Sequence, residues 1–250
     1  MRSKTVLAAL CSLSLLSQYS SAHFDFTPRI DGGRVVVGGY DDGAGDTVST
    51  LRVNGYDFGE TADDPYNITD PGFNTLGAST FTGGTTLRLT AVATGGTMGG
   101  TFLRYWNGVG EPTFAPAAAG TTVSLSASPT RTLTFSAAGT VATPAGVMDL
   151  QVGTFGTNGS LHAHLGTSIA AATPAVPEGA YLIAFALTNP GTGVNASEPI
   201  YVVYNNGLTE SQHDAAIEAA TAAYVPEPGV ATLLSGVLVL TRRRRRGIAK

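Results

Sequence analysis

The sequence predicts an all-β fold: an antiparallel β-sandwich or jelly-roll-like domain with one short C-terminal helix. Two observations support this prediction. About ten short runs of β-branched and aromatic residues recur along the chain, and Gly, Pro and Asn-Gly breaks separate them. No long helical pattern lies between these runs, so consecutive strands are expected to pair or to pack as two layers.

Turn residues indicate where neighbouring strands reverse direction. Gly83-Gly84 and Ser128-Pro129 each separate two apolar runs and predict hairpins. The stretch 59–73 is acidic, contains proline and lacks alternation, which predicts a long surface loop. The expected strands are residues 35–37, 47–57, 79–93 with a break at the glycine pair, 101–106, 121–126, 131–136, 147–155, 161–169, 180–188 and 200–204.

One helix is expected, over residues 209–224. Thr209-Glu210-Ser211-Gln212 is a capping-box pattern, and a run of alanines continues it at helical spacing until Val225-Pro226. We expect this helix to dock after the last strand and to act as a spacer, with His213 as a surface or capping residue.

Charge is distributed unevenly along the 250-residue chain. Residues 23–224 contain six arginines, no lysine and 17 acidic residues, hence a net charge of −11, whereas the whole chain carries −4. A strongly acidic domain argues against nucleic acid as a partner. It is compatible with binding of cations.

The first 22 residues have the pattern of a secretory signal peptide. Met1-Arg2-Ser3-Lys4 is a positively charged start, residues 5–16 are apolar, and Ser20-Ser21-Ala22 is a cleavage site of small residues. Cleavage there would make His23 the mature N-terminus. Cys11 is the only cysteine, so the exported domain would be stabilised by its core, without disulfides.

The last 26 residues, 225–250, have three ordered parts. A turn comes first, an uncharged apolar run over 229–241 follows, and a cluster of arginines ends the pattern. The cluster is costly to move across a bilayer, which places it on the cytoplasmic side. The run is shorter than the ~20 residues of a comfortable span, so a buried core helix with a basic tail is the alternative. The turn is Pro226-Glu227-Pro228, and the cluster is Arg242, Arg243, Arg244, Arg245 and Arg246.

This tail resembles the PEP-CTERM sorting tail of bacterial surface proteins. The resemblance implies processing by a membrane protease-transpeptidase called exosortase. It also implies an inner-membrane anchor, followed by display at the cell surface or secretion. It gives an address and no activity. The expected organisation is a signal peptide (1–22), an all-β extracytoplasmic domain (23–208), a helical spacer (209–224) and the sorting tail (225–250).

His162-Ala163-His164 is the clearest candidate for chemistry. On a strand, residues two apart project from one face about 7 Å apart, so both imidazoles could converge on one transition-metal ion such as zinc or copper. A mature N-terminal His23 could chelate with its amine and imidazole, and Asp25 lies two residues on. These four residues are the expected site. The competing interpretation is a polar face on an exposed strand.

A second resemblance concerns the same pair. Leu161-His162-Ala163-His164, followed by Pro177-Glu178-Gly179-Ala180-Tyr181, is similar to bacterial surface-anchored domains of the choice-of-anchor M type, and His23-Phe24-Asp25 stands where that pattern has a His-x-Asp pair. This resemblance implies an association with metal uptake. The usual tryptophan after the histidine pair is missing, and the only tryptophan is Trp106.

Hydrolase and nucleotide-binding motifs are absent from the sequence: it contains no Gly-x-Ser-x-Gly, no His-Glu-x-x-His and no phosphate-binding loop. We therefore expect a binding protein rather than an enzyme. Two alternatives stay open at this stage. One is a structural or adhesive component of the cell surface or extracellular matrix, and the other is a copper-dependent oxidative polysaccharide enzyme that uses His23.

Overall fold

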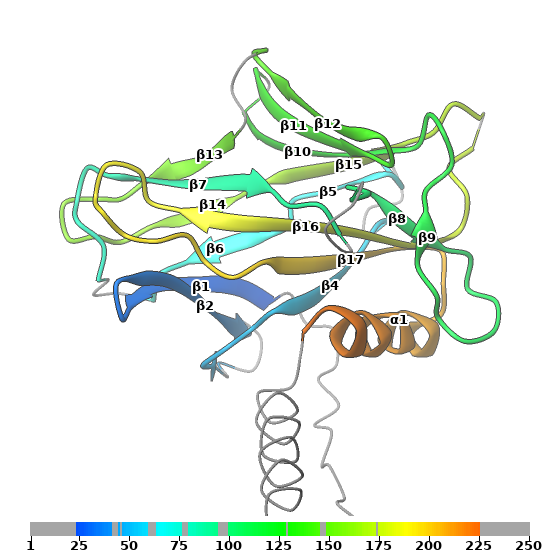
Figure 1. Ribbon diagram of the computed structural model, residues 1–250, viewed down its shortest axis with the longest axis horizontal. Helices are drawn as coiled ribbons and strands as arrows, with labels where there is room; N and C mark the ends of the chain where they lie inside the picture. Colours follow the sequence, from blue (N-terminus) through cyan, green and yellow to red (C-terminus); the bar gives the residue numbers. More distant parts are fainter. Residues whose placement is uncertain are drawn as a thin grey trace, which may run out of the picture.

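The structure is a computed structural model, and it describes residues 24–225 except 42–44, 46, 60–63, 77–79, 95–99, 129, 146–148 and 174. The described chain is mostly β, with a single helix after the last strand (Figure 1). In chain order the elements are β1 (Phe24–Asp31), β2 (Arg34–Asp41), β3 (Thr47–Val48), β4 (Val53–Asp57), β5 (Asn67–Ile68), β6 (Gly72–Asn74), β7 (Thr86–Ala91), β8 (Arg104–Trp106), β9 (Ala115–Pro116), β10 (Thr122–Ser128), β11 (Arg131–Ser136), β12 (Gly139–Thr143), β13 (Asp149–Thr154), β14 (His162–His164), β15 (Gly166–Ala170), β16 (Gly179–Thr188), β17 (Ile200–Asn206) and α1 (Glu210–Tyr224).

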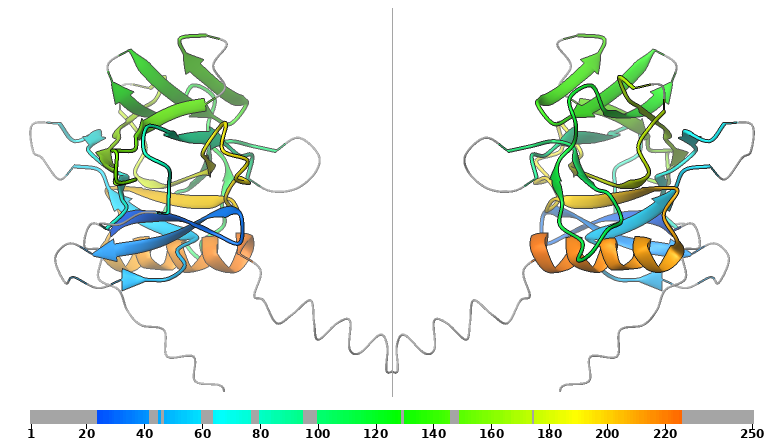
Figure 2. Two further views of the ribbon diagram at one scale, coloured as in Figure 1. Left: turned by 90° about the vertical axis from the view of Figure 1, so that its left-hand side faces the viewer. Right: turned by 90° about the vertical axis from the view of Figure 1, so that its right-hand side faces the viewer.

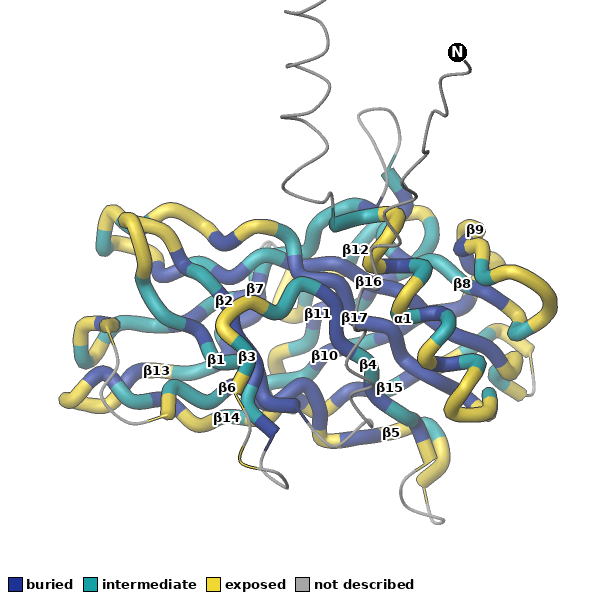
Figure 3. Tube along the Cα trace, turned by 90° about the horizontal axis from the view of Figure 1, so that it is seen from below, coloured by how far each residue is buried: buried dark blue, intermediate teal, exposed yellow. Residues whose placement is uncertain are grey.

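The described strands form three sheets in a sandwich-like arrangement. Their strand orders are β14-β6-β1-β2-β3, β12-β11-β10-β15-β5 and β13-β7-β16-β17-β4, with β8 attached to β16 and β9 attached to β8. One core joins all three sheets, since Phe26, Leu89 and Leu125, one from each sheet, belong to the same buried cluster. The buried part of the chain runs through the middle of the molecule along β16 and β17 (Figure 3).

The central strand β16 is buried on both faces. Tyr181, Ile183 and Phe185 point into the shared core, whereas the alternating Ala180 and Leu182 belong to a second apolar cluster that packs against the helix. A strand covered on both sides loses the alternation of apolar and polar residues and becomes a continuous apolar run. This explains why residues 180–188 were predicted from composition rather than from alternation.

Helix α1 covers the outer face of β4 and β17 (Figures 1 and 2). Its capping box forms as predicted, because the Thr209 side chain accepts from the Gln212 backbone and the Gln212 side chain accepts from the Thr209 backbone. Ala216 and Ala220 face the sheet together with His213. The prediction that His213 lies at the surface is wrong: only 2% of this residue is exposed.

Three predictions about the strands need correction. Residues 80–85 do not pair as the first arm of a hairpin. Instead Phe81 is buried and stacks on Phe155, with ring centroids 4.2 Å apart. The predicted surface loop 59–73 contains β5 and the start of β6, and residues 70–73 are buried. Strands β1, β9 and β12 were missed. The hairpin at Ser128-Pro129 is confirmed by the antiparallel pairing of β10 with β11.

Residues 1–22, His23 and the tail from Pro226 to Lys250 lie outside the described residues. The predicted signal peptide and sorting motif therefore remain predictions. Within the described part of the chain, no helix is both long and apolar enough to cross a bilayer.

Candidate metal centre

The sheet β14-β6-β1 brings the predicted ligands together from distant parts of the sequence. β14 pairs antiparallel with β6, so that His164 lies opposite Gly72 and His162 opposite Asn74. β6 pairs in parallel with β1 through Phe73 and Phe26. Because side chains alternate along a strand, Phe26 and Phe73 enter the core, while Asp25 and the two histidines share the opposite face.

Three ligand atoms converge on this face. Nε2 of His162 lies 3.0 Å from Nε2 of His164 and 3.7 Å from Oδ2 of Asp25. One ligand atom from each of the three residues lies within 4.8 Å of the others. Ligands at zinc–nitrogen and zinc–oxygen distances of about 2.0–2.1 Å in a tetrahedral site stand about 3.3 Å apart, so the observed spacing suits a single ion.

His164 is oriented by the segment before β6. Its Nδ1 lies 3.1 Å from the Thr69 carbonyl oxygen and 3.8 Å from Oδ1 of Asp70. A carbonyl oxygen only accepts, so Nδ1 carries the proton and the Nε2 lone pair faces Asp25 and His162. Metal-binding histidines usually donate their second nitrogen to a carbonyl or carboxylate in this way.

Buried hydroxyl groups hold the backbone on both sides of the centre. Tyr56 donates to the Phe24 carbonyl at 2.8 Å, directly before Asp25. On the other side Thr167 donates to the Asp70 carbonyl, and Tyr204 lies 3.4 Å from the Thr167 hydroxyl. Burial raises the pKa of the Tyr56 phenol well above its usual value, and the nearby Asp70 and Tyr204 raise it further. Both tyrosines thus remain hydrogen-bonding phenols at neutral pH.

Gly72 provides the space that the ligands occupy. A methyl group on its backbone would collide with Oδ1 of Asp25 and would lie 2.9 Å from Cε1 of His164. The residue is buried at the start of β6, directly across from His164. Its lack of a side chain is therefore required for a carboxylate and an imidazole to meet over this strand.

The centre is open to solvent on one side. The side chains of His162 and His164 are 58% and 42% exposed, while that of Asp25 is only 3% exposed. Asp25 is therefore the buried ligand, and the two imidazoles are the ligands accessible to solvent. Three protein ligands leave a position for water, substrate or a further ligand, as in zinc sites that exchange their ligands.

Of the four predicted ligands, the structure brings together Asp25, His162 and His164, and His23 lies outside the described residues. Leu161 and Leu165 are buried on the other face of β14, as predicted. Sequence reasoning missed the orienting segment Thr69–Gly72. An Asp-Pro-Gly sequence at the end of an acidic loop, just before an aromatic residue, was the available signal.

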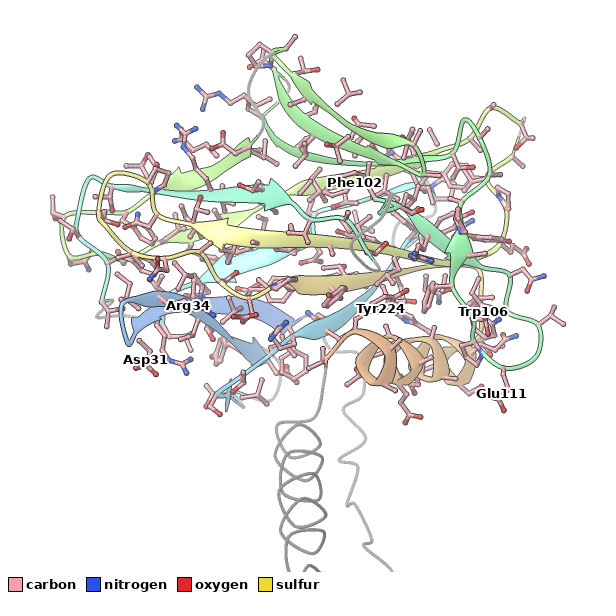
Figure 4. All side chains as sticks on the ribbon, viewed as in Figure 1. Asp31, Arg34, Phe102, Trp106, Glu111 and Tyr224 are labelled. Carbon is pink, nitrogen blue, oxygen red and sulfur yellow. The ribbon has the colours of Figure 1, made fainter. Side chains whose placement is uncertain are left out.

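The burial of Trp106 bears on the alternative of a copper-dependent oxidative enzyme. Trp106 is 5% exposed, and its Nε1 donates to the Val109 carbonyl at 3.2 Å. Trp106 and Glu111 lie at the opposite end of the sandwich from Asp31 and Arg34 (Figure 4). Trp106 therefore does not form part of an exposed aromatic face.

The chain matches no protein-family model, no curated protein and no solved structure at a significant level.

Proposed function

We propose that this protein binds a transition-metal ion, zinc or copper, through Asp25, His162 and His164, as an exported surface or envelope protein. The observation that supports it most is the 3.0 Å approach of the two Nε2 atoms, with the Asp25 carboxylate 3.7 Å from one of them. Imidazole and carboxylate together are a common ligand set for zinc and copper.

The short distance between the two Nε2 atoms can also be explained by a hydrogen bond between the imidazoles, without a metal ion. In the absence of metal, Nε2–H of His162 donates to Nε2 of His164, a geometry that two neutral imidazoles adopt at 3.0 Å. A metal ion would bind Nε2 of His162 in place of that proton, which would move to Nδ1 of the same ring, and the ion would recruit Asp25 as a third ligand. Metal binding therefore needs no rearrangement of β14.

The cellular address is proposed from the two ends of the sequence. The signal-peptide pattern (1–22) and the PEP-CTERM-like tail would place the domain outside the cytoplasm, held first at the inner membrane and then released or displayed. The wider proposal includes the jelly-roll-like architecture, the tail helix and an exosortase-type processing enzyme as a partner. Fractionation that found an unprocessed, cytoplasmic chain would contradict this part alone.

Calorimetric zinc titration of the purified full-length chain in detergent tests the metal site. We expect one ion per chain, and a loss of affinity of at least a hundredfold in the double variant His162→Ala/His164→Ala. The control is Thr140→Ala/Thr143→Ala, which alters the strand β12 of another sheet. No stoichiometric binding of zinc or copper by the unmodified chain would favour the structural or adhesive role instead.

A further inference from the structure

A cleft of about 500 Å³ lies on the same sheet as the metal centre. This volume falls in the range of small-molecule sites. Its walls come from β1, from β3 with the residue after it, and from Thr75, Leu76 and Thr80 after β6. The lining residues that matter here are Thr27, Arg29, Val48, Ser49, Thr75 and Leu76.

Strand β1 connects the cleft with the metal centre. Asp25, Thr27 and Arg29 are alternate residues of one strand, so their side chains share a face. Thr27 lies about 7 Å along the strand from Asp25, and Arg29 about 13 Å, at roughly 3.3 Å per residue. Asn74, opposite His162, continues the same face on β6. Thr27, which lines the cleft, is thus the next side chain after Asp25 on this face of β1.

The wall after β6 is held in an unusual backbone conformation. Leu76 has a φ of 46°, in the left-handed region that residues with large side chains rarely adopt. Its backbone N–H donates to the Asn74 side chain at 3.0 Å. The Thr75 hydroxyl accepts from the Leu161 backbone at 2.8 Å, which ties this wall to the residue before His162. One segment thus shapes both the cleft and β14.

The cleft offers donors and a positive charge. Nη2 of Arg29 donates to the Ser49 carbonyl at 2.9 Å, which orients the guanidinium group at the cleft. Within the described part of the chain, no carboxylate pairs with this guanidinium, whereas Arg34 pairs with Glu198 and Arg88 with Asp149. A planar guanidinium whose other N–H groups can still donate is suited to binding carboxylate and phosphate groups.

A divalent ion at the three ligands, of which Asp25 is the one carboxylate, would add a second cationic group with a position open to an anionic ligand. The cleft would then have a cationic group at each end in a domain that is otherwise acidic. We propose, as an extension of the proposed metal-binding function, that it binds a small organic molecule with two oxyanion groups, carboxylate or phosphate. One group ligates the ion at its open position, and the other pairs with Arg29.

Calorimetry on the zinc-loaded full-length chain with malonate, glutarate and pimelate tests this inference. Because Arg29 lies about 13 Å along β1 from Asp25, we expect the longest of the three, pimelate, to bind at least tenfold more tightly than glutarate or malonate. Without zinc, affinity should fall at least tenfold. Arg29→Gln should lose most of the dicarboxylate affinity and change zinc affinity less than twofold. Arg131→Gln, an exposed arginine on β11 of another sheet, is the matched control. Equilibrium dialysis with metal analysis verifies that zinc stays on the protein.

Two results would contradict one or both proposals, and a third would support the inference and refine it. If zinc binds but dicarboxylates show no length preference, or Arg29→Gln binds them as well as the unmodified chain, the cleft inference is wrong and the metal site stands. If neither zinc nor copper binds, both proposals fail. Tighter binding of 6-phosphonohexanoate than of pimelate, which has the same number of methylene groups, again lost in Arg29→Gln, supports the inference and identifies phosphate as the preferred group.

Discussion

Two histidine–aspartate clusters in this protein use the same residue types for different ends. On β14, His162 and His164 turn their Nε2 atoms toward each other and toward Asp25. Under α1, Nε2 of His213 instead donates to the Val203 carbonyl at 3.0 Å, while its Nδ1 lies 3.4 Å from Oδ1 of Asp57. The imidazoles of the first cluster are exposed, whereas the His213 imidazole of the second is buried and only its partner Asp57 is partly exposed.

The difference shows what distinguishes a candidate ligand from a structural histidine. His213 is 2% exposed, with Nε2 bonded to a backbone carbonyl and Nδ1 beside a carboxylate, so an ion in solvent has no path to the ring. At β14 the Thr69 carbonyl holds Nδ1 of His164, and that bond aims Nε2 at the exposed point where it meets Nε2 of His162. Burial and the direction of the lone pair matter here more than residue type.

Gly72→Ala should have the largest effect on the comparison, because it damages only the first cluster. The added methyl group meets the Asp25 carboxylate and the His164 ring. We expect a loss of about 2–3 kcal/mol in the free energy of unfolding and at least a hundredfold loss of zinc affinity, measured by denaturant unfolding and calorimetry. Gly139→Ala is the control, since a methyl group there meets nothing within 4 Å. Equal effects of the two substitutions would contradict the assigned geometry.

His213→Ala should lower the stability of the protein and leave zinc affinity unchanged, because it damages only the second cluster. It removes a buried ring and leaves the Val203 carbonyl without its donor, which costs about 2 kcal/mol of stability. Zinc affinity should not change. The exposed helix residue Glu218→Ala serves as the control for α1. If zinc affinity fell with His213→Ala, the distinction between the two clusters would be wrong.

Asp25→Asn tests the buried ligand. The amide keeps the shape and loses the charge, so we expect zinc affinity to fall about tenfold, about 1.4 kcal/mol of binding free energy. Asp31→Asn is a matched control at the exposed end of the same strand and on the same face. Identical zinc affinities for the two variants would remove Asp25 from the site.

We expect alkaline pH to have the smallest effect of these tests. It acts on Tyr56 and Tyr204, whose hydroxyl groups lie beside the metal centre. The pKa values of Tyr56 and Tyr204 are raised above 10, mainly by burial. Since the unfolded chain releases these protons near pH 10 and the folded chain does not, their contribution to stability is complete below pH 10 and is lost as pH rises further. Tyrosinate absorbance should show fewer than the nine tyrosines of the chain ionising until the protein unfolds. Ionisation of all nine near pH 10 in the folded protein would show that these phenols are accessible.

Local signals in the sequence predicted local structure well. The capping box of α1, the apolar run of β16 and the hairpin between β10 and β11 each depend on neighbouring residues, and each is confirmed. Strand β1 was missed because Pro28 and charged residues interrupt its apolar pattern. Its parallel pairing with β6 joins segments far apart in the chain, which no local pattern encodes.

In the metal site, too, the sequence predicted the local features and missed those that depend on long-range pairing. A period of two placed His162 and His164 on one face, and the structure confirms that placement. Asp25 was proposed from its nearness to His23, but it reaches the pair through the β1–β6 pairing. The orienting carbonyl of Thr69 and the space at Gly72 are backbone features of a segment predicted to be a surface loop, so residue types alone could not reveal them.

The central claim is that Nε2 of both His162 and His164 binds one ion while His213 does not. Nitrogen-15 NMR of the imidazole rings tests it directly, because the chain has only four histidines. On addition of one equivalent of zinc, we predict that the Nε2 signals of His162 and His164 move together to metal-bound shifts and that those of His213 stay unchanged. Zinc that left both β14 imidazoles unchanged, or that shifted His213, would contradict the account.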